Sequence, residues 1–323
     1  MDEKLDFLDL PNEVLFNIFL YIPDIDNYKY KFNNKNLTVI IEAMINLYIR
    51  KFSSIDQQWQ NDIQNFTRKL FLLKGSNDLI IFLYNNIESS KQYVQYYVGY
   101  YGNDYLLNLI NFKNYNLIAS IAAENGYIST VMIAVAKGAN NYNRIAFIAA
   151  ENGYLDIVKY VVEKGANNYN KITKIGAENG YLAIVKYAFK KGANNYNRIA
   201  FIAAENGYLD IVKYVVNKGA NNYNKIAFIA AENGYLAIVK YAFKKGADNY
   251  NAVNLTAAKN GYLRIVKYVI KNGANNYAQV ALIAVRNNHI KIVKYVARKS
   301  GDDYERIKKL LLLHGYENIV NAL

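Results

Sequence analysis

The chain has 323 residues, of which 53% are hydrophobic and 20% charged, a composition typical of a folded protein and not of a disordered one. It has no cysteine, which excludes a disulfide scaffold and a thiolate metal site and suits an intracellular protein. The first nine residues lack the basic start of a secretory signal, and no apolar run reaches the roughly 18–20 residues that span a bilayer. We therefore expect an intracellular, cytoplasmic protein without a membrane segment.

The net charge of +13 belongs to the later part of the chain. Residues 1–120 hold 11 Lys and Arg against 13 Asp and Glu, whereas residues 121–323 hold 28 against 13. A basic segment of this kind suits acidic partners or nucleic acid, although lysine is also a common solvated residue of helical repeats.

Residues 1–45 are predicted to contain a short amphipathic helix between the two prolines of the chain, Pro11 and Pro23. The sequence Leu10-Pro11-Asn12-Glu13-Val14-Leu15, followed by Ile18-Phe19, resembles the opening half of an F-box. The resemblance implies that this segment binds the adaptor subunit of a cullin-type ubiquitin ligase, with the contact made by Leu10, Pro11, Glu13 and Ile18.

The F-box resemblance covers about 20 residues. Residues 27–36 depart from the family, because they are polar and aromatic where the motif has a leucine-rich second helix. An N-terminal helix that packs on the first repeats is the alternative interpretation. Residues 46–89 are predicted to be a helical junction or a degenerate repeat, with helices near 69–73 and 79–84.

Residues 90–323 are predicted to form a repeat array with a period of 27 residues. A Gly-Tyr step and a Gly-Ala step return once per repeat, and a period between 20 and 50 residues is the signature of a solenoid. We place the start of the register at Ser90, with Gly99-Tyr100 aligned to Gly126-Tyr127. The glycines of the Gly-Tyr step are Gly126, Gly153, Gly180, Gly207, Gly234 and Gly261.

The repeat Arg144–Asn170 is predicted to fold as two short helices. Asn143 is the expected N-cap of the first, which ends at Asn152-Gly153, and the second runs from about Leu155 to Gly165. Helices this short are stable only when stacked, so the expected fold class is all-α, an α-solenoid of helix–turn–helix repeats. A column of small residues is expected where successive repeats approach: Ala122, Ala149, Gly176, Ala203, Ala230, Ala257 and Ala284.

The segments Ala149 to Lys159 and Lys164 to Asn167 are similar to the second half of the ankyrin-repeat consensus. Two features depart from it: the first helix lacks the Thr-Pro-Leu-His start, and the repeat is about six residues shorter because the β-hairpin is missing. The composition also resembles the short, Asn/Tyr/Ile/Lys-rich arrays encoded by large DNA viruses of amoebae. The resemblance implies protein binding on the first helices, which line the concave side of ankyrin arrays.

Residues 144–197 and 198–251 differ at only five positions, which indicates duplication of a two-repeat unit. Exposed positions that vary while the rest of the repeat stays fixed are where partner choice would reside. The candidate partner-binding residues of the repeats are Phe147, Lys174, Phe201, Phe228, Arg144, Lys171, Arg198 and Lys225.

We predict no enzyme, no cofactor and no metal, because two distant histidines, His289 and His314, cannot supply a zinc site or an acid–base triad. The predicted function is that of a protein–protein interaction adaptor. A basic array that binds nucleic acid or another polyanion is the alternative, based on the lysine column of Lys159 and the tyrosine column of Tyr142. A structural spacer without a specific ligand is a third interpretation.

Overall fold

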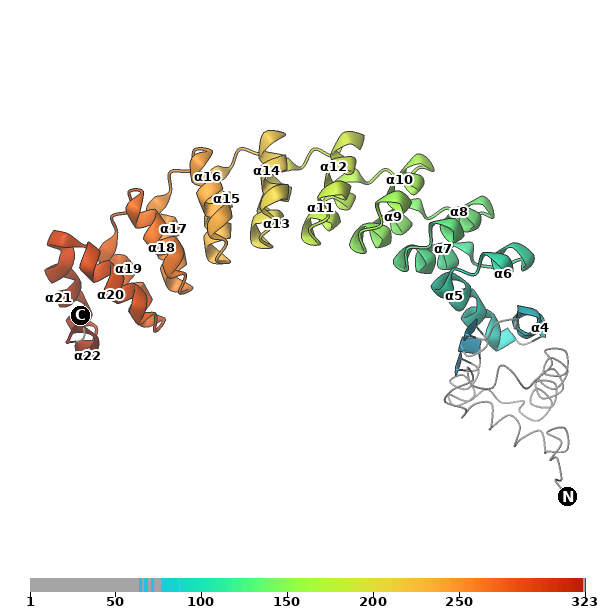
Figure 1. The fold of residues 1–323 in the computed structure, drawn as a ribbon, viewed down its shortest axis with the longest axis horizontal. Coiled ribbons are helices and arrows are strands. Elements are labelled where there is room, and N and C mark those ends of the chain that lie inside the picture. The colour runs from blue at the N-terminus through green and yellow to red at the C-terminus, as the bar shows by residue number, and fades with distance from the viewer. Residues whose placement is uncertain (1–63, 66, 69–70, 73–76, 87, 322) are drawn as a thin grey trace, which may run out of the picture. The chain divides into compact units, whose positions relative to one another are not determined.

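A computed structural model of the chain describes residues 64–65, 67–68, 71–72, 77–86, 88–321 and 323 (Figure 1). Over these residues the regular secondary structure is helical and contains no strand, and the helices stack in pairs. The predicted all-α solenoid of helix–turn–helix repeats is thereby confirmed. The F-box-like segment lies outside the described residues.

The chain divides into two compact units, Met1–Asn167 and Asn168–Leu323. The division falls inside the predicted repeat array, between two repeats, and each unit is described separately below. The sequence-based boundaries of 1–45, 46–89 and 90–323 stay predictions.

From residue 77 onward, the described part of the first unit contains one helix and a short 3-10 turn, followed by three helix pairs. In each pair the first helix packs on the second, and successive first helices also pack on each other. The elements are α4 (Asn77–Asn86), η3 (Glu88–Ser90), α5 (Lys91–Tyr101), α6 (Asp104–Leu109), α7 (Tyr115–Glu124), α8 (Ile128–Ala136), α9 (Tyr142–Glu151) and α10 (Leu155–Glu163).

The second unit continues the same pattern with six helix pairs. Successive first helices are in more extensive contact than successive second helices, so this unit is packed more tightly on its first-helix side (Figure 1). The elements are α11 (Tyr169–Glu178), α12 (Leu182–Lys191), α13 (Tyr196–Glu205), α14 (Leu209–Asn217), α15 (Tyr223–Glu232), α16 (Leu236–Lys244), α17 (Tyr250–Lys259), α18 (Leu263–Lys271), α19 (Tyr277–Arg286), α20 (Ile290–Lys299), η4 (Gly301–Asp303), α21 (Tyr304–Leu313) and α22 (Glu317–Val320).

The first helix of each repeat begins earlier than its sequence predicts. Helix α9 starts at Tyr142 and Asn141 occupies its N-cap position, so the predicted N-cap at Asn143 is wrong. In α11 the residue equivalent to Asn141 caps with its side chain, since Asn168 accepts a hydrogen bond from the backbone N–H of Lys171 at 3.3 Å. The predicted helix ends near Gly153 and Gly165 are confirmed.

Asn143 instead forms hydrogen bonds with the loop that follows α10, the second helix of the same pair. Its Oδ1 accepts a hydrogen bond from the backbone N–H of Asn167 at 3.0 Å, and its Nδ2 donates to Asn167 Oδ1 at 3.1 Å. We call this pair of hydrogen bonds the asparagine clasp. Equivalent clasps join Asn116 to Asn140, Asn170 to Asn194, Asn197 to Asn221, Asn224 to Asp248, and Asn251 to Asn275.

After several of the first helices a glycine contacts a ring of the next repeat; these glycines are Gly102, Gly126, Gly180, Gly207, Gly234 and Gly261. Gly126 has φ 81°, and a Cβ built on it would lie 2.6 Å from Cε1 of Tyr154. Gly102 has φ 64° and the same relation to Tyr127, whereas Gly99 lies inside α5. Gly102 is thus the equivalent of Gly126, and the predicted alignment of Gly99 is wrong because this repeat is shorter than 27 residues.

The predicted column of small residues is fully buried in every repeat. At Gly176, an added Cβ would lie 3.1 Å from Cγ2 of Ile184 and 3.4 Å from Cγ2 of Val185, both on α12 of the same repeat. The closest contacts of Gly176 are therefore with the second helix of its own repeat. We had expected them to be with the next repeat. Small side chains here let the two helices pack closely.

Candidate binding surfaces

The predicted site residues of the repeats lie on one face of the first helices. They are the third and sixth residues of each helix, and the tenth residue lies on the same face because of the helical period. We call these three positions together the first-helix surface. On α9 they are Arg144, Phe147 and Glu151, in the first unit.

In the second unit α11, α13 and α15 are adjacent, so their site residues form one continuous part of the first-helix surface (Figure 1). The basic side chains at the third position are exposed and the side chains at the sixth position are half-buried. This grouping brings together Lys171, Lys174, Arg198, Phe201, Lys225 and Phe228.

Two contacts order the side chains of this surface. The Nζ of Lys225 lies 5.4 Å from the centre of the Phe228 ring, within the range of a cation–π interaction. Lys174, which replaces phenylalanine in α11, forms an ion pair of 2.9 Å with Glu178 one turn later. The sixth position thus changes from an aromatic to a charged group without a change in the helix.

The charge at the tenth position of the first-helix surface reverses along the second unit. Helices α11, α13 and α15 carry a base at the third position and a glutamate at the tenth. Helix α17 carries Ala252 and Lys259 at these positions, and α19 carries Gln279 and Arg286. A partner that spans this unit would meet acid at the ends of three first helices and base at the ends of the next two.

The second helices carry a different arrangement, of lysine beside tyrosine. The Nζ of Lys186 on α12 lies 5.7 Å from the ring centre of Tyr214 on α14, in the next repeat. Lys240 and Tyr268 repeat this contact at 5.5 Å. The tyrosines of this column were not singled out from the sequence, although their lysine neighbours were.

The lysine column alternates with the duplicated two-repeat unit. Where the helix has an aspartate in its first turn, the lysine pairs with it, as Lys159 does with Asp156 at 3.5 Å. Lys213 and Asp210 form the same pair at 3.6 Å in the second unit. Where alanine replaces the aspartate, the lysine reaches the tyrosine of the next repeat instead.

The predicted tyrosine column of Tyr142 does not present open rings. Its members are the first residues of the first helices and are half-buried. The Tyr196 ring stacks on Phe189 at 4.5 Å between centres, and Tyr250 stacks on Phe243 at 4.1 Å. In these two tyrosines one face of the ring is therefore occupied by packing and is not open to a stacked base.

The described residues contain no group of three or more His, Cys, Asp or Glu that could hold a metal ion. His289 occupies the ring position of the Gly-Tyr contact, since a Cβ on Gly261 would lie 2.7 Å from its Cε1. One of its ring nitrogens, Nε2, lies 3.0 Å from the carbonyl oxygen of Lys259. None of the helices described in this structure is both long and apolar enough to cross a bilayer.

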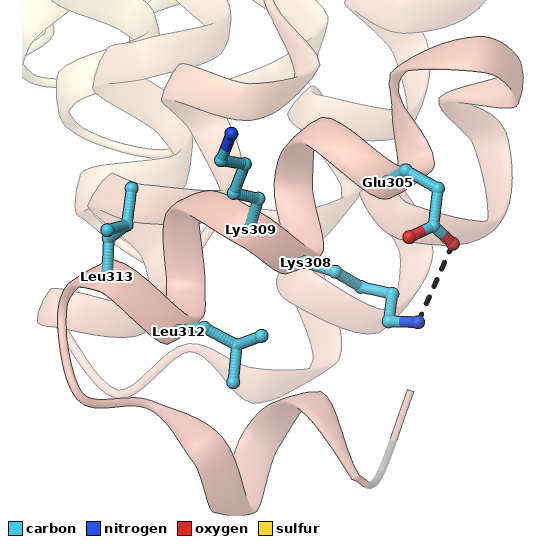
Figure 2. A pocket seen from close by; sticks show the side chains of 5 residues that line it. All are labelled: Glu305, Lys308, Lys309, Leu312 and Leu313. Carbon is cyan, nitrogen blue, oxygen red and sulfur yellow. Dashed lines mark ion pairs between the residues drawn. The ribbon is translucent and has the colours of Figure 1, made fainter.

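An open groove of about 430 Å³ lies on α21 in the last repeat (Figure 2). It is lined by Glu305, Lys308, Lys309, Leu312 and Leu313, and an ion pair of 3.5 Å joins Lys308 to Glu305. The Leu313 side chain is 76% exposed. This groove is separate from the residues that the sequence singled out.

Comparison with known proteins identifies the repeats. Residues 174–254 and 227–308 match the family model described as ankyrin repeats in three copies. The crystal structure of the human ASB11 ankyrin repeat domain is similar over 49% of this chain and 84% of that chain, with 18% sequence identity and a TM-score of 0.44. No curated protein matches the sequence. Residues 174–308 of this chain are therefore ankyrin repeats.

Proposed function

We propose that the chain is a protein-interaction adaptor whose first-helix surface binds a protein partner. The observation that supports this proposal is the row of exposed bases beside half-buried aromatic rings on α11, α13 and α15. Aromatic residues and arginine are the side chains that most often carry the binding energy of protein interfaces. The role requires no catalysis and no cofactor.

The pattern of substitution between nearly identical repeats supports the same surface. Residues 144–197 and 198–251 differ at five positions, and one of the five replaces Lys174 with Phe228 on the first-helix surface. Because the tenth position changes from acidic to basic at α17, the two ends of the surface differ in charge. A partner with complementary charge would bind in one orientation, because the opposite orientation would place like charges together.

The test compares the proteins captured by the full chain and by a variant with Phe201→Lys and Phe228→Lys. Lys174 shows that the sixth position accepts lysine without loss of the helix, so the variant is expected to fold. A partner bound through the rings should lose at least about tenfold in affinity, the loss of about one hot-spot residue. The matched control removes two exposed apolar side chains elsewhere, with Leu312→Ala and Leu313→Ala. Equal capture by the wild type and the phenylalanine variant would contradict the proposal.

We also propose that the F-box-like segment recruits a cullin-type ubiquitin ligase through Leu10, Pro11, Glu13 and Ile18. These residues lie outside the described part of the chain, and the proposal rests on the resemblance of the motif. Co-precipitation of the ligase adaptor subunit with the full chain tests it. The variant with Leu10→Ala and Pro11→Ala should lose the adaptor and keep the partner of the repeats.

The composition resembles that of short repeat arrays of large DNA viruses of amoebae, and on that basis we propose that the protein acts in the cytoplasm of a host cell. The absence of cysteine agrees with a reducing compartment. Microscopy of the tagged full chain in amoebae tests this location, and accumulation outside the cytoplasm would contradict it.

A further inference from the structure

The positive charge of the second unit lies on one side of its helix pairs. Helices α12, α14, α16, α18 and α20, each with the residue that follows it, hold fifteen Lys and Arg and one acid, Asp210. The first helices α11, α13, α15, α17 and α19 hold six bases and three acids. We call the outer side chains of these five second helices the second-helix surface.

The bases of this surface are oriented toward water, and acids do not neutralise them within the surface. Asp210 is the single acid there, and its ion pair with Lys213 is the one pair that these five helices can form among themselves. The side chains of Lys186, Lys240 and Lys267 are all exposed. Several lysines at helix ends stabilise the helix dipole, but these three lie in the middle of their helices and do not serve that purpose.

The tyrosines order these lysines into rows that cross from one repeat to the next. The ammonium groups of Lys186, Lys240 and Lys267 lie 5.7, 5.5 and 5.3 Å from the ring centres of Tyr214, Tyr268 and Tyr295 in the following repeat. Cation–π contacts of this kind hold a charge in place without cancelling it. The result is a linear series of fixed, solvent-facing positive charges.

We infer that the second-helix surface binds the phosphate backbone of a nucleic acid, a site separate from the first-helix surface of the proposed function. A linear polyanion matches a linear series of bases, and release of its condensed counterions supplies the binding free energy. A protein partner would need a desolvated apolar centre. The aromatic rings of this surface are half-buried, and lysine ammonium groups lie over them.

The same contacts determine the mode of binding. The ring of Tyr214 has two ammonium groups over it, those of Lys186 at 5.7 Å and Lys218 at 5.9 Å. A base could stack on this ring only by displacing a lysine. The rings of Tyr268 and Tyr295 each have one ammonium group over them, so the row is not an open stacking platform for single strands. Recognition is therefore of backbone charge, independent of sequence, and duplex and single-stranded probes should both bind.

The test measures binding of a random-sequence DNA duplex and of an oligo-thymidine strand to the full chain, by fluorescence anisotropy between about 50 and 200 mM salt. One variant carries Lys186→Gln, Lys240→Gln and Lys267→Gln on the second-helix surface. The matched control removes three charges from the first-helix surface, with Lys171→Gln, Arg198→Gln and Lys225→Gln. A third variant replaces the same three second-helix lysines by arginine, which keeps charge and cation–π contacts.

The second-helix variant should bind at least about tenfold more weakly, and its salt slope for the duplex should be shallower by about 3, the value for three phosphate contacts. The first-helix control and the arginine variant should bind within about threefold of wild type. The inference is overturned if wild type fails to bind duplex at about 50 mM salt, or if both glutamine variants lose affinity equally. It is also overturned if polyglutamate or phosphatidylserine vesicles bind as tightly as DNA.

Discussion

The ring of Tyr235 lies against the α-carbon of Gly207, one repeat earlier in the chain, so closely that a Cβ on Gly207 would overlap Cε1 of the ring. Gly207 also has φ 82°, a conformation that other residues adopt at a cost. One residue thus ends a first helix and makes room for the ring that connects two repeats.

Gly207→Ala should therefore destabilise the fold for two reasons. We expect a loss of about 1–3 kcal/mol from the positive φ alone, and a further loss from displacement of the ring. Chemical denaturation of the full chain measures the change. Gly315→Ala is the matched control, because Gly315 has a similar φ of 79° with no atom within 4 Å of the added Cβ. A loss no larger than that of the control would show that the ring contact contributes nothing.

The asparagine clasp is the basis of a second prediction. Asn197 Oδ1 accepts hydrogen bonds from the backbone N–H groups of Asn221 and Asn222 at 2.9 and 3.2 Å. Asn197→Ala removes this acceptor, and with it both hydrogen bonds, and should lower the free energy of unfolding by about 1 kcal/mol, a modest value because the site is exposed to water. Asn197→Asp keeps an acceptor oxygen for the two backbone N–H groups and loses only the donor to Asn221 Oδ1, so it should change stability less. Equal losses for the two variants would rule out the acceptor role.

Overpacking of the small-residue column gives a third prediction. Ala203 is fully buried, and Ala203→Leu should force the two helices of its repeat apart at a cost of about 1–3 kcal/mol. Thermal melting of the full chain would show the loss as a lower midpoint. An unchanged midpoint would mean that the structure accommodates the larger side chain.

The fourth prediction concerns Gly176→Ala, a smaller change in the same column as Ala203. Alanine has the higher helix propensity by about 0.8–1.0 kcal/mol, and the equivalent Ala230 is fully buried without disruption of its repeat. We expect Gly176→Ala to leave stability unchanged or raise it, although its Cβ would lie 3.1 Å from Cγ2 of Ile184. A clear loss would mean that α11 and α12 are held closer together than their equivalents.

The tyrosines of the second helices predict a dependence of stability on alkaline pH. Burial, with a smaller effect of a nearby tyrosine, raises the pKa of Tyr160, Tyr214, Tyr241, Tyr268 and Tyr295. The neutral phenol is thus favoured in the folded state. The associated stability is complete below the unfolded pKa of about 10 and is lost as pH rises through the higher folded pKa.

Ultraviolet titration of phenolate checks this expectation. In the native chain some of the tyrosines should titrate with a midpoint above pH 10. In denaturant the midpoint of these tyrosines should fall to about 10. Tyr214→Phe with Tyr241→Phe should reduce the late fraction and the loss of stability above pH 10. Identical titrations of native and unfolded chain would contradict the prediction.

The sequence was sufficient for the helices, their C-terminal glycines and the repeat register from Tyr115 onward, because these depend on local chemistry and on a period that recurs many times. It was insufficient at Asn143, since three asparagines in one Asn-Asn-Tyr-Asn loop can each act as a cap. The shift from Gly99 to Gly102 has a similar cause, because Gly99-Tyr100 imitates the Gly-Tyr step, whereas the equivalent glycine, Gly102, is followed by Asn103. The positions of the site residues followed from the helical period, but their ion pairs and ring contacts did not.

The contact between Lys186 and Tyr214 shows why such features are missed. The two residues belong to different repeats, 28 positions apart, and meet only because α12 and α14 pack at a particular angle. The charge of each column can be read from the sequence. The face on which that charge gathers depends on which helices lie side by side, and that becomes visible only in three dimensions.

When each repeat is counted from the start of its first helix, as at Tyr142 of α9, both partners of its asparagine clasp belong to that repeat, one in the first helix and the other in the loop after the second helix. A copied block of two repeats therefore carries complete clasps and leaves no amide without its partner at the new junction. The array can gain or lose blocks during evolution without a compensating mutation at the joint. The near-identity of residues 144–197 and 198–251 is the result expected from such a duplication.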